Sequence, residues 1–338
     1  MKMYSKKIYI CHTEYHLLIT LLKNLEEKNT NKNDIVLYVT LQNIDTLYER
    51  LLKSNIFENI YIFDYKDAEE ITKLPGGKNF LDVKRNIKKY LRKNYNLKYL
   101  ENKDIYMFND HSIIGLYLRL NKCKYNLIED GLDTYKNIEK HYNFNYNIKE
   151  ILKIYFDTID CVFGKSKYVK SIEINDKDGI DLFINKKFVV NSRVELFSKL
   201  QEIDRRKILE IFYENEFEKI NGDAILLITQ PLYKDGFLND EEQQIEMYKY
   251  ILKKFEGKNL IIKPHPRDEI DYKKIFNDSV ILKRTYPIEI LNFVNNISIK
   301  RCITAFSTSI DGINFCEEKI KLGYDFVEKY RIGENSGE

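Results

Sequence analysis

Short apolar runs alternate with segments of helical periodicity along nearly the whole chain. In the first half the strand-like runs are Lys7–Thr13, Asp34–Thr40, Asn59–Asp64, Asp104–Asn109, Tyr125–Glu129, Asp160–Phe163 and Lys187–Asn191. Segments with apolar residues at helical spacing, such as Glu14–Glu27 and Ile44–Ser54, lie between them. A repeated strand–helix order is typical of parallel sheets with helices on both faces. The alternation therefore predicts an α/β protein.

The alternation is interrupted once, by a long helical pattern from Leu196 to Phe212. After Asn221-Gly222 a second series begins, whose strand-like runs are Ala224–Thr229, Asn259–Lys263, Val280–Leu282, Ser298–Ala305 and Lys319–Leu322. We place a boundary near Asn215–Asp223, which predicts two parallel-sheet domains, residues 1–215 and 216–325, and a polar tail, 326–338. Ligands of open parallel sheets bind at the carboxyl ends of strands, so polar clusters at those ends are candidate sites.

Composition and charge exclude several classes of protein. The 338 residues include 55 Lys and Arg and 52 Asp and Glu, so the chain lacks the basic excess of a nucleic-acid-binding protein. Five cysteines without a CxxC pair argue against a disulfide framework or a zinc site. We find no signal peptide after Met1–Lys7 and no apolar run long enough to span a membrane. We therefore expect a cytoplasmic protein, with homodimerisation left open.

An acidic pair and a glycine, Glu129-Asp130-Gly131, follow the apolar run Tyr125–Ile128. A carboxylate at the rim of a sheet can act as a general base if burial or a charged neighbour adjusts its pKa. An ordinary turn is the competing interpretation, because Asp-Gly is among the commonest turn pairs.

The segment Lys263–Arg267, with the sequence KPHPR, follows the run Asn259–Ile262. Pro264 and Pro266 restrain the backbone on both sides of His265, which holds the imidazole at a fixed angle. A histidine so placed can bind or protonate a leaving phosphate, with the flanking Lys and Arg adding positive charge. A surface turn with an incidental histidine is the alternative.

Hydroxyl residues Ser307, Thr308 and Ser309 stand between the run Ser298–Ala305 and a predicted helix, Ile310–Phe315. Hydroxyls and backbone N–H groups at a helix N-terminus can bind a phosphate or a carboxylate. Serine and threonine are also the usual N-cap residues, so a purely structural cap is an equal alternative.

Two further strand-like runs end in polar residues. His12 and Thr13 end the first run and would face a binding cleft. His16 continues the helical pattern that follows and is interpreted as half-buried structure. In the segment Asn109–Ser112 we expect Asp110 to serve as a helix cap.

A metal site and a membrane-binding helix are weighed against simpler interpretations. Asp176-Lys177-Asp178 has the DxD spacing of some metal sites, but it runs into Gly179 between alternating stretches and predicts a hairpin turn.

Basic residues from Lys84 to Lys93 lie on a helix whose apolar stripe includes Val83 and Leu91. Such a helix can rest on an anionic membrane, although a solvated face of a core-packed helix is commoner.

The order of these clusters is informative. Acid-acid-Gly, then His-Pro, then a Ser/Thr pair resembles the motif series of bacterial sialyltransferases with the GT-B fold, in which two Rossmann-like domains face a cleft. The segment Cys11–Ile19, CHTEYHLLI, further resembles glycosyltransferase family 52, the lipooligosaccharide sialyltransferases. Glu14 departs from the proline expected there.

The resemblance implies an inverting, metal-independent transfer of sialic acid from CMP-sialic acid to a terminal galactoside of a surface glycan, lipooligosaccharide or capsule. Asp130 would be the general base, and His265 would bind and protonate the leaving phosphate. The second domain would bind the donor through Lys263, Pro266, Ser307, Thr308, Ser309, Gln230 and Glu289. The first domain would face the acceptor with Glu129, Gly131, His12 and Thr13. No cofactor is expected, and the partners are the nucleotide-sugar donor, a galactose-terminated glycan and, peripherally, the membrane.

Three alternatives stay open at this point. A CDP-glycerol polyol-phosphate transferase of the same fold also carries a Lys-x-His-Pro-like element. A transferase for another CMP-linked sugar, such as Kdo, fits the same motifs. A protein of a different class, one that binds nucleotides or glycans without catalysis, would retain the fold but show no turnover.

Overall fold

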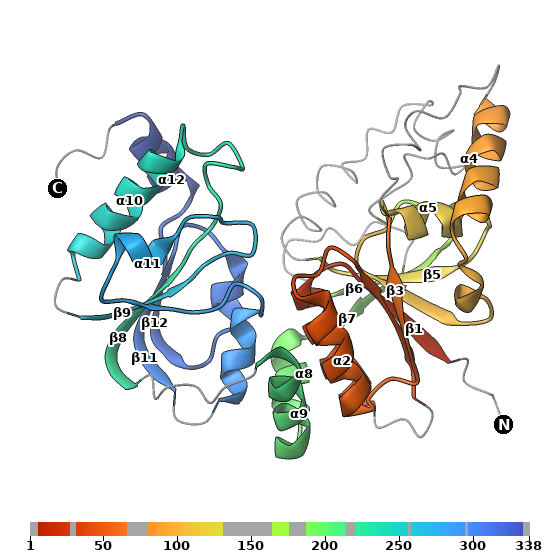
Figure 1. Ribbon diagram of the computed structural model, residues 1–338, viewed down its shortest axis with the longest axis horizontal. Coiled ribbons are helices and arrows are strands. Elements are labelled where there is room, and N and C mark those ends of the chain that lie inside the picture. Colours follow the sequence, from red (N-terminus) through yellow and green to blue (C-terminus); the bar gives the residue numbers. More distant parts are fainter. Residues whose placement is uncertain are drawn as a thin grey trace. The chain divides into compact units, whose positions relative to one another are not determined.

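The computed structural model describes residues 6–27, 32–65, 80–130, 164–175, 187–213, 221–255, 258–294 and 297–333 (Figure 1). The chain divides into two compact units, unit 1 (Met1–Asp204) and unit 2 (Arg205–Glu338). This division precedes the boundary placed at 215/216 from the sequence. It falls inside helix α9 (Glu202–Phe212), part of the long helical pattern that the sequence assigned to the first domain.

Seven described strands of unit 1 form one parallel sheet in the order β3-β2-β1-β4-β5-β6-β7. Their bounds are β1 Lys7–Cys11, β2 Asp34–Tyr38, β3 Asn59–Phe63, β4 Asp104–Met107, β5 Tyr125–Ile128, β6 Val169–Ile174 and β7 Lys187–Val190. β2 and β5 are buried along their whole length, as expected for central strands covered on both faces. The parallel sheet predicted from the alternation is confirmed.

The alternating stretch that ends at Ile174 does not form the hairpin expected from the sequence. It belongs to β6, which lies between β5 and β7 and pairs in parallel with both. Period-2 alternation indicates a strand but not the direction of its partner, so a neighbouring turn signal misled the prediction. Asp176 and Asp178 lie outside the described residues.

The helices that the structure describes in unit 1 are α1 (Glu14–Glu26), α2 (Ile44–Ser54), α4 (Phe80–Asn94), η1 (Lys98–Leu100), α5 (Ile113–Leu120) and α8 (Arg193–Lys199). α1 begins directly after β1 because the Thr13 side chain accepts a hydrogen bond from the His16 N–H, which caps the helix. Its apolar residues, including Leu17, Leu18 and Leu21, are fully buried. The first turn of α1 is thereby held at the carboxyl end of the sheet.

The basic helix is α4, and its apolar stripe is packed inside the protein. Ile87 and Leu91 form a buried cluster with Leu116 of α5. Arg85, Lys89, Arg92 and Lys93 are exposed along the same helix. This is the arrangement of a core-packed helix with a solvated basic face; the side chains of Val83 and Lys84 lie outside the described set.

The cap of α5 differs from the expectation. Its N-cap is Ser112, whose hydroxyl accepts from the Gly115 N–H, and not Asp110. Asp110 is buried instead and accepts hydrogen bonds from the Tyr125 hydroxyl and the Gly164 N–H, each at 3.0 Å. A Cβ at Gly115 would lie 2.1 Å from the Asp110 carbonyl oxygen, so the close approach of this turn to α5 requires glycine.

Five described strands of unit 2 form a second parallel sheet in the order β10-β9-β8-β11-β12. Their bounds are β8 Asn221–Ile228, β9 Asn259–Lys263, β10 Val280–Ile281, β11 Ser298–Thr304 and β12 Cys316–Lys321. The helices described in unit 2, besides most of α9, are α10 (Glu241–Lys253), α11 (Tyr272–Ile275), η2 (Ile288–Phe293), η3 (Thr308–Gly312) and α12 (Tyr324–Arg331). The helix predicted at Ile310–Phe315 is therefore the short 3-10 turn η3, and β12 begins earlier than expected.

The segment 326–338, predicted as a polar tail, begins with most of helix α12. Val327 is only 2% exposed and packs in the core of unit 2 with Met247 and Leu252 of α10. Phe326 and Tyr330 pack against the same core. The average polarity of the segment hid these apolar positions at helical spacing. Among the helices that the structure describes, none combines the length and the hydrophobicity needed to cross a bilayer.

Candidate functional site

Asp130 and His16 meet at the carboxyl end of the unit 1 sheet. Asp130 follows β5, and His16 lies in the first turn of α1. The His16 Nε2 atom is 2.6 Å from Asp130 Oδ1, although the two residues are 114 positions apart in the chain. His16 is fully buried. The sequence interpretation of His16 as half-buried structure missed this contact, because helical spacing reports only that a residue faces the protein.

The hydrogen bonds around His16 determine where its proton lies. The His12 main-chain N–H donates to His16 Nδ1 at 3.1 Å, so Nδ1 is an acceptor. A neutral imidazole with Nδ1 as acceptor carries its proton on Nε2, which donates to the Asp130 carboxylate. Phe108 stacks on the ring at a centroid distance of 4.2 Å and an interplanar angle of 3°. The ring is thus held in one orientation and one tautomer.

The Asp130 carboxyl is stabilised in its ionised form. Burial alone would raise its pKa, but the charge interaction and hydrogen bond with His16, with smaller contributions from His12 and His111, hold the pKa below its usual value. Its side chain is nevertheless 38% exposed. An ionised carboxylate that solvent can reach, hydrogen-bonded to a fixed donor, is suited to accept a proton.

His12 lies beside this pair. Its ring packs on Tyr38 at a centroid distance of 3.6 Å and meets His16 edge-on at 6.0 Å. Burial first, and then the proximity of His16, lower the His12 pKa to about 3, so the ring is neutral at physiological pH. Among the described atoms, none is hydrogen-bonded to the buried His12 Nε2.

The other predicted residues of this region have structural contacts. Thr13 is exposed and uses its hydroxyl to cap α1. Glu129 is buried, and its carboxylate accepts a hydrogen bond from the Asn175 N–H at the end of β6. The two adjacent carboxylates therefore have different surroundings, and only that of Asp130 contacts His16. Gly131 lies outside the described residues.

His265 follows β9 in unit 2, as the sequence predicts, and its backbone and ring are both held. Its main-chain N–H donates to Thr229 Oγ1 at 3.2 Å. The Arg267 N–H donates to His265 Nδ1 at 3.1 Å, so the neutral ring carries its proton on Nε2. Burial first, then the positive charges of Arg267 and Lys263, lower the His265 pKa to about 4. At neutral pH the ring offers a neutral N–H donor.

The two cations that flank His265 are already engaged. Lys263 is 4% exposed, and its ammonium donates to the carbonyl oxygens of Pro264 at 3.1 Å and Arg284 at 3.4 Å. The guanidinium of Arg267 pairs with both carboxylate oxygens of Asp235, at 2.7 and 2.9 Å. Lys263 thus contacts backbone carbonyls in this structure, and its predicted contact with the donor stays a prediction. A side chain near the end of a strand can turn into the core, and the sequence does not show its direction.

Glu289 is also buried. It lies in η2, where burial raises its pKa to about 7 despite the nearby charge of Lys263. A Cβ on Gly312 would lie 3.1 Å from Glu289 Cγ, so the glycine lets η3 approach η2 closely. Pro266 is partly exposed beside His265.

Gln230 and the hydroxyl residues lie together at the carboxyl end of the unit 2 sheet. The Gln230 side-chain oxygen accepts from the Phe306 N–H at 2.8 Å. Ser307 caps η3, because its hydroxyl accepts from the Ser309 N–H at 3.4 Å and lies 2.6 Å from the Ser309 hydroxyl. Thr308 is the partly buried first residue of η3. Thr229 and Gln230, adjacent at the end of β8, thus contact the His-Pro segment and the serine segment respectively.

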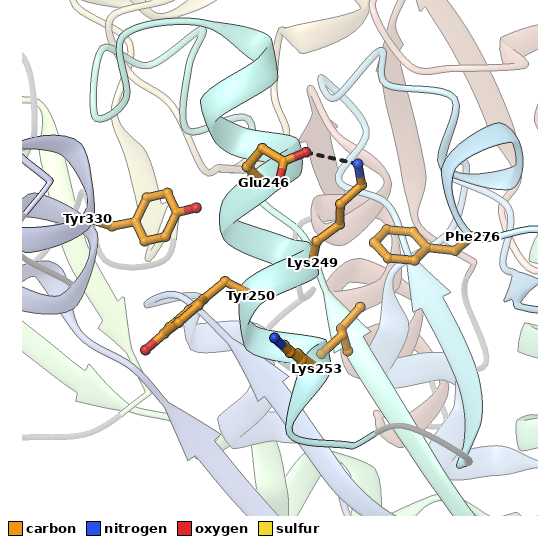
Figure 2. Close-up of a pocket in the computed structure, with 7 residues that line it drawn as sticks. Glu246, Lys249, Tyr250, Lys253, Phe276 and Tyr330 are labelled. Atoms are coloured by element: carbon orange, nitrogen blue, oxygen red, sulfur yellow. Dashed lines mark hydrogen bonds and ion pairs between the residues drawn. The ribbon is translucent and has the colours of Figure 1, made fainter. Parts of the chain in front are cut away.

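A pocket of about 540 Å³ lies elsewhere in unit 2 (Figure 2). Its lining comes from α10, from Phe276 after α11, and from α12: Glu246, Lys249, Tyr250, Leu252, Lys253, Phe276 and Tyr330. No residue predicted to bind the donor belongs to this lining. Lys249 within it is paired with Glu246 at 2.8 Å. The pocket is therefore separate from the unit 2 residues that are predicted to bind the donor.

Sequence comparison gives two matches. The chain matches the family described as glycosyltransferase family 52 over residues 67–325. An uncharacterized protein of Haemophilus influenzae is 31% identical over 205 residues, which cover 60% of this chain and 63% of that protein. The chain therefore spans less than two thirds of the length of this relative.

Comparison of structures identifies a similar fold in two enzymes. The α/β-galactoside α-2,3-sialyltransferase of Photobacterium phosphoreum has a TM-score of 0.58 at 14% identity, over 98% of this chain and 96% of that one. The GT-B domain of a sialyltransferase from Photobacterium damselae has a TM-score of 0.50 at 15% identity, over 91% and 88% of the two chains. At these identities the likeness is one of fold. It confirms the predicted α/β class with two parallel-sheet units.

Proposed function

Because the chain belongs to glycosyltransferase family 52, we propose that it transfers sialic acid from CMP-sialic acid to a terminal galactoside of a bacterial surface glycan, lipooligosaccharide or capsule. Two of the structures with a similar fold are sialyltransferases, and one of these is named for its action on galactosides, which supports this choice of reaction. The proposal includes inversion at the anomeric carbon and transfer without a metal ion.

The observation that carries the proposal is the contact between Asp130 and His16. In the proposed reaction the acceptor hydroxyl oxygen attacks the anomeric carbon of sialic acid while Asp130 takes the hydroxyl proton. The bond from that carbon to the phosphate oxygen of CMP breaks in the same displacement, which inverts the configuration. An ionised carboxylate is needed for this step, and the His16 hydrogen bond keeps Asp130 in that form.

His265 is proposed to act on the leaving group. Its Nε2–H can donate to a phosphate oxygen of CMP without first gaining a proton, since Nδ1 already accepts from Arg267. A neutral imidazole cannot release this proton, so in this form His265 stabilises the leaving phosphate by hydrogen bonding. Protonation of the leaving oxygen would require the imidazolium form, which an approaching phosphate favours by raising the pKa of the ring. Ser307 and Thr308 would add hydroxyl donors to the same phosphate. These groups would balance the leaving-group charge in place of a metal.

The direct test is CMP release from CMP-sialic acid in EDTA, with lactose or N-acetyllactosamine as acceptor. We expect the purified protein to release CMP and form a sialylated product. The His265→Ala variant should lose about 100-fold in rate, while Lys249→Ala, in the separate pocket, should retain full activity. Activity that needs an added divalent cation would contradict the metal-independent mechanism.

The same assay separates the alternatives. Turnover of CDP-glycerol in place of CMP-sialic acid would indicate a polyol-phosphate transferase, and turnover of CMP-Kdo a related sugar transferase. Binding of CMP-sialic acid that survives Asp130→Asn, without turnover by the wild type, would indicate a non-catalytic binding protein. Failure to bind any CMP-linked sugar would overturn the proposed donor.

We extend the proposal to peripheral contact with an anionic membrane, which would bring the protein to a lipid-linked acceptor. The exposed basic residues of α4, among them Lys89 and Lys93, support this extension. Cosedimentation with vesicles containing anionic lipid should fall in Lys89→Glu/Lys93→Glu and in high salt. Equal binding of wild type and variant would remove the membrane from the proposal.

A further inference from the structure

A buried carboxylate, Asp268, lies next to the main chain of His265 in unit 2. We propose that Asp268, acting through Thr229, is a positioning residue that sets the orientation of His265; its catalytic consequence rests on the proposed function. Asp268 is 2% exposed and belongs to none of the motifs by which the site was identified. Its hydrogen bonds reach the His265 main chain and not the ring, so its effect on the ring passes through the His265 backbone, directly and through Thr229.

The Asp268 carboxylate is surrounded by donors. Its Oδ2 atom accepts from the Tyr272 hydroxyl at 2.7 Å, the Thr229 hydroxyl at 2.8 Å and the Gln244 amide at 3.4 Å. Its Oδ1 atom accepts from the Ile270 N–H at 3.3 Å. A buried carboxylate with this many donors is held firmly, because turning away would leave several buried groups unpaired.

The direction of the hydrogen bonds passes this constraint to His265. A threonine hydroxyl has one proton, and Thr229 uses it to donate a hydrogen bond to the Asp268 carboxylate, whose oxygens accept hydrogen bonds. The remaining lone pairs of Thr229 Oγ1 then face the His265 N–H, which donates at 3.2 Å. The Asp268 N–H also donates to the His265 carbonyl oxygen at 3.0 Å. Both backbone groups of His265 are thus held by Asp268, one directly and one through Thr229.

This arrangement leaves the ring little freedom. With its backbone held on both sides, His265 places Nδ1 at the Arg267 N–H, and this contact fixes the proton on Nε2. Gln230, next to Thr229, holds the Phe306 N–H just before the serine segment. A single strand end therefore aligns the two segments proposed to bind the leaving phosphate. Loss of the Thr229 hydroxyl should disturb His265 before it disturbs the fold.

Three variants isolate the proposed link. Thr229→Val keeps the shape of the side chain but removes the hydroxyl between Asp268 and His265. Thr229→Ser restores the hydroxyl and should restore the wild-type behaviour. Tyr272→Phe removes a different donor to the same carboxylate and leaves the link to His265 intact. A purely structural network would respond to Thr229→Val and Tyr272→Phe alike, since each loses one buried hydrogen bond to Asp268.

The first readout needs no turnover. In protein labelled with nitrogen-15 at histidine, the signals of His265, assigned by comparison with His265→Gln, report which ring nitrogen carries the proton. We expect the Nε2–H form in wild type, Thr229→Ser and Tyr272→Phe, and a mixture of the two neutral forms in Thr229→Val. An unchanged Nε2–H form in a folded Thr229→Val protein overturns the proposal.

The second readout is the rate of transfer. We expect kcat to fall about 10- to 100-fold in Thr229→Val, with Thr229→Ser and Tyr272→Phe within a few-fold of wild type. Equal losses in Thr229→Val and Tyr272→Phe would show a general loss of packing and would overturn the positioning role. If no CMP-linked sugar is turned over by the wild type, the proposed function fails, but the histidine spectra still decide whether Thr229 and Asp268 position His265.

Discussion

Each unit holds one histidine ring with its proton on Nε2, but this N–H group has different surroundings in the two units. In both His16 and His265 a backbone N–H donates to Nδ1, so the ring proton lies on Nε2. The His16 Nε2–H group donates a hydrogen bond to a carboxylate of its own unit, Asp130. No described residue accepts the Nε2 proton of His265. One histidine is therefore hydrogen-bonded to the carboxylate that we propose as the base, while the other has an Nε2–H group that could donate to the proposed ligand.

The surroundings of the two rings match this difference. His16 is fully buried and stacked on Phe108. His265 is only partly buried, and its pKa is lowered to about 4 by burial and by Arg267 and Lys263. A site with nearby positive charge and an unshared N–H donor suits an anion. The comparison teaches that the same tautomer can serve either proton abstraction or anion binding, depending on what Nε2 meets.

The strongest test of the comparison is to remove Asp130, the base that we propose in unit 1. Asp130→Asn keeps the size of the side chain but cannot accept the acceptor proton, so we expect transfer to fall about 1,000-fold. The Kd for CMP, measured by calorimetry, should stay unchanged, because the His265 region is untouched. Transfer within tenfold of wild type would remove Asp130 from the proton-transfer step.

The titration of His265 tests the unit 2 side of this comparison, because it should make the free energy of unfolding depend on pH. Its folded pKa, about 4, lies below the ordinary value of 6.5, so the unfolded chain binds more protons between these values. The stabilisation is therefore complete above pH 6.5 and is lost as the pH falls toward 4. Urea unfolding should show this loss, about 1–3 kcal/mol, in wild type relative to His265→Gln. Parallel pH curves for the two proteins would contradict a neutral His265.

Substitution of His16 sharpens the comparison by altering the base without removing it. His16→Phe keeps an aromatic ring against Phe108 but deletes the donor to Asp130. The Asp130 pKa should rise, because His16 provides the largest influence that lowers it. The acidic limb of the kcat/KM profile should then move to higher pH, with a rate loss on the order of 10-fold. An unmoved limb would mean that Asp130 does not titrate in that profile.

The smallest expected effect concerns the caps that place the two sites. Thr13 caps the 13-residue helix α1, whereas Ser307 caps the five-residue turn η3. Thr13→Ala should lower the free energy of unfolding by about 1 kcal/mol. Ser307→Ala should lower it less, because fewer residues depend on its cap. Urea titrations of both variants test this order, and a larger loss for Ser307→Ala would reverse it.

Much of the fold follows from the sequence because burial leaves a local pattern. The runs that became β1, β2, β8 and β9 are apolar over most of their length, as strands covered on both faces must be. The strand-end rule also placed Asp130 and His265 correctly at the carboxyl ends of β5 and β9. Two predictions from the sequence were wrong. At β6 the strand was predicted but its partner strand was not, and at α12 the average polarity of the segment concealed buried positions.

The sequence by itself determined the parallel α/β class, the two sheets and the strand ends at which polar groups gather. Only the tertiary structure decided what those groups contact. It joined His16 to Asp130 across 114 residues, turned Lys263 inward to backbone carbonyls and placed Asp268 behind His265. The physical reason is that periodicity records whether a side chain is buried. A hydrogen bond depends on distance and direction between atoms that strand order and loop paths bring together.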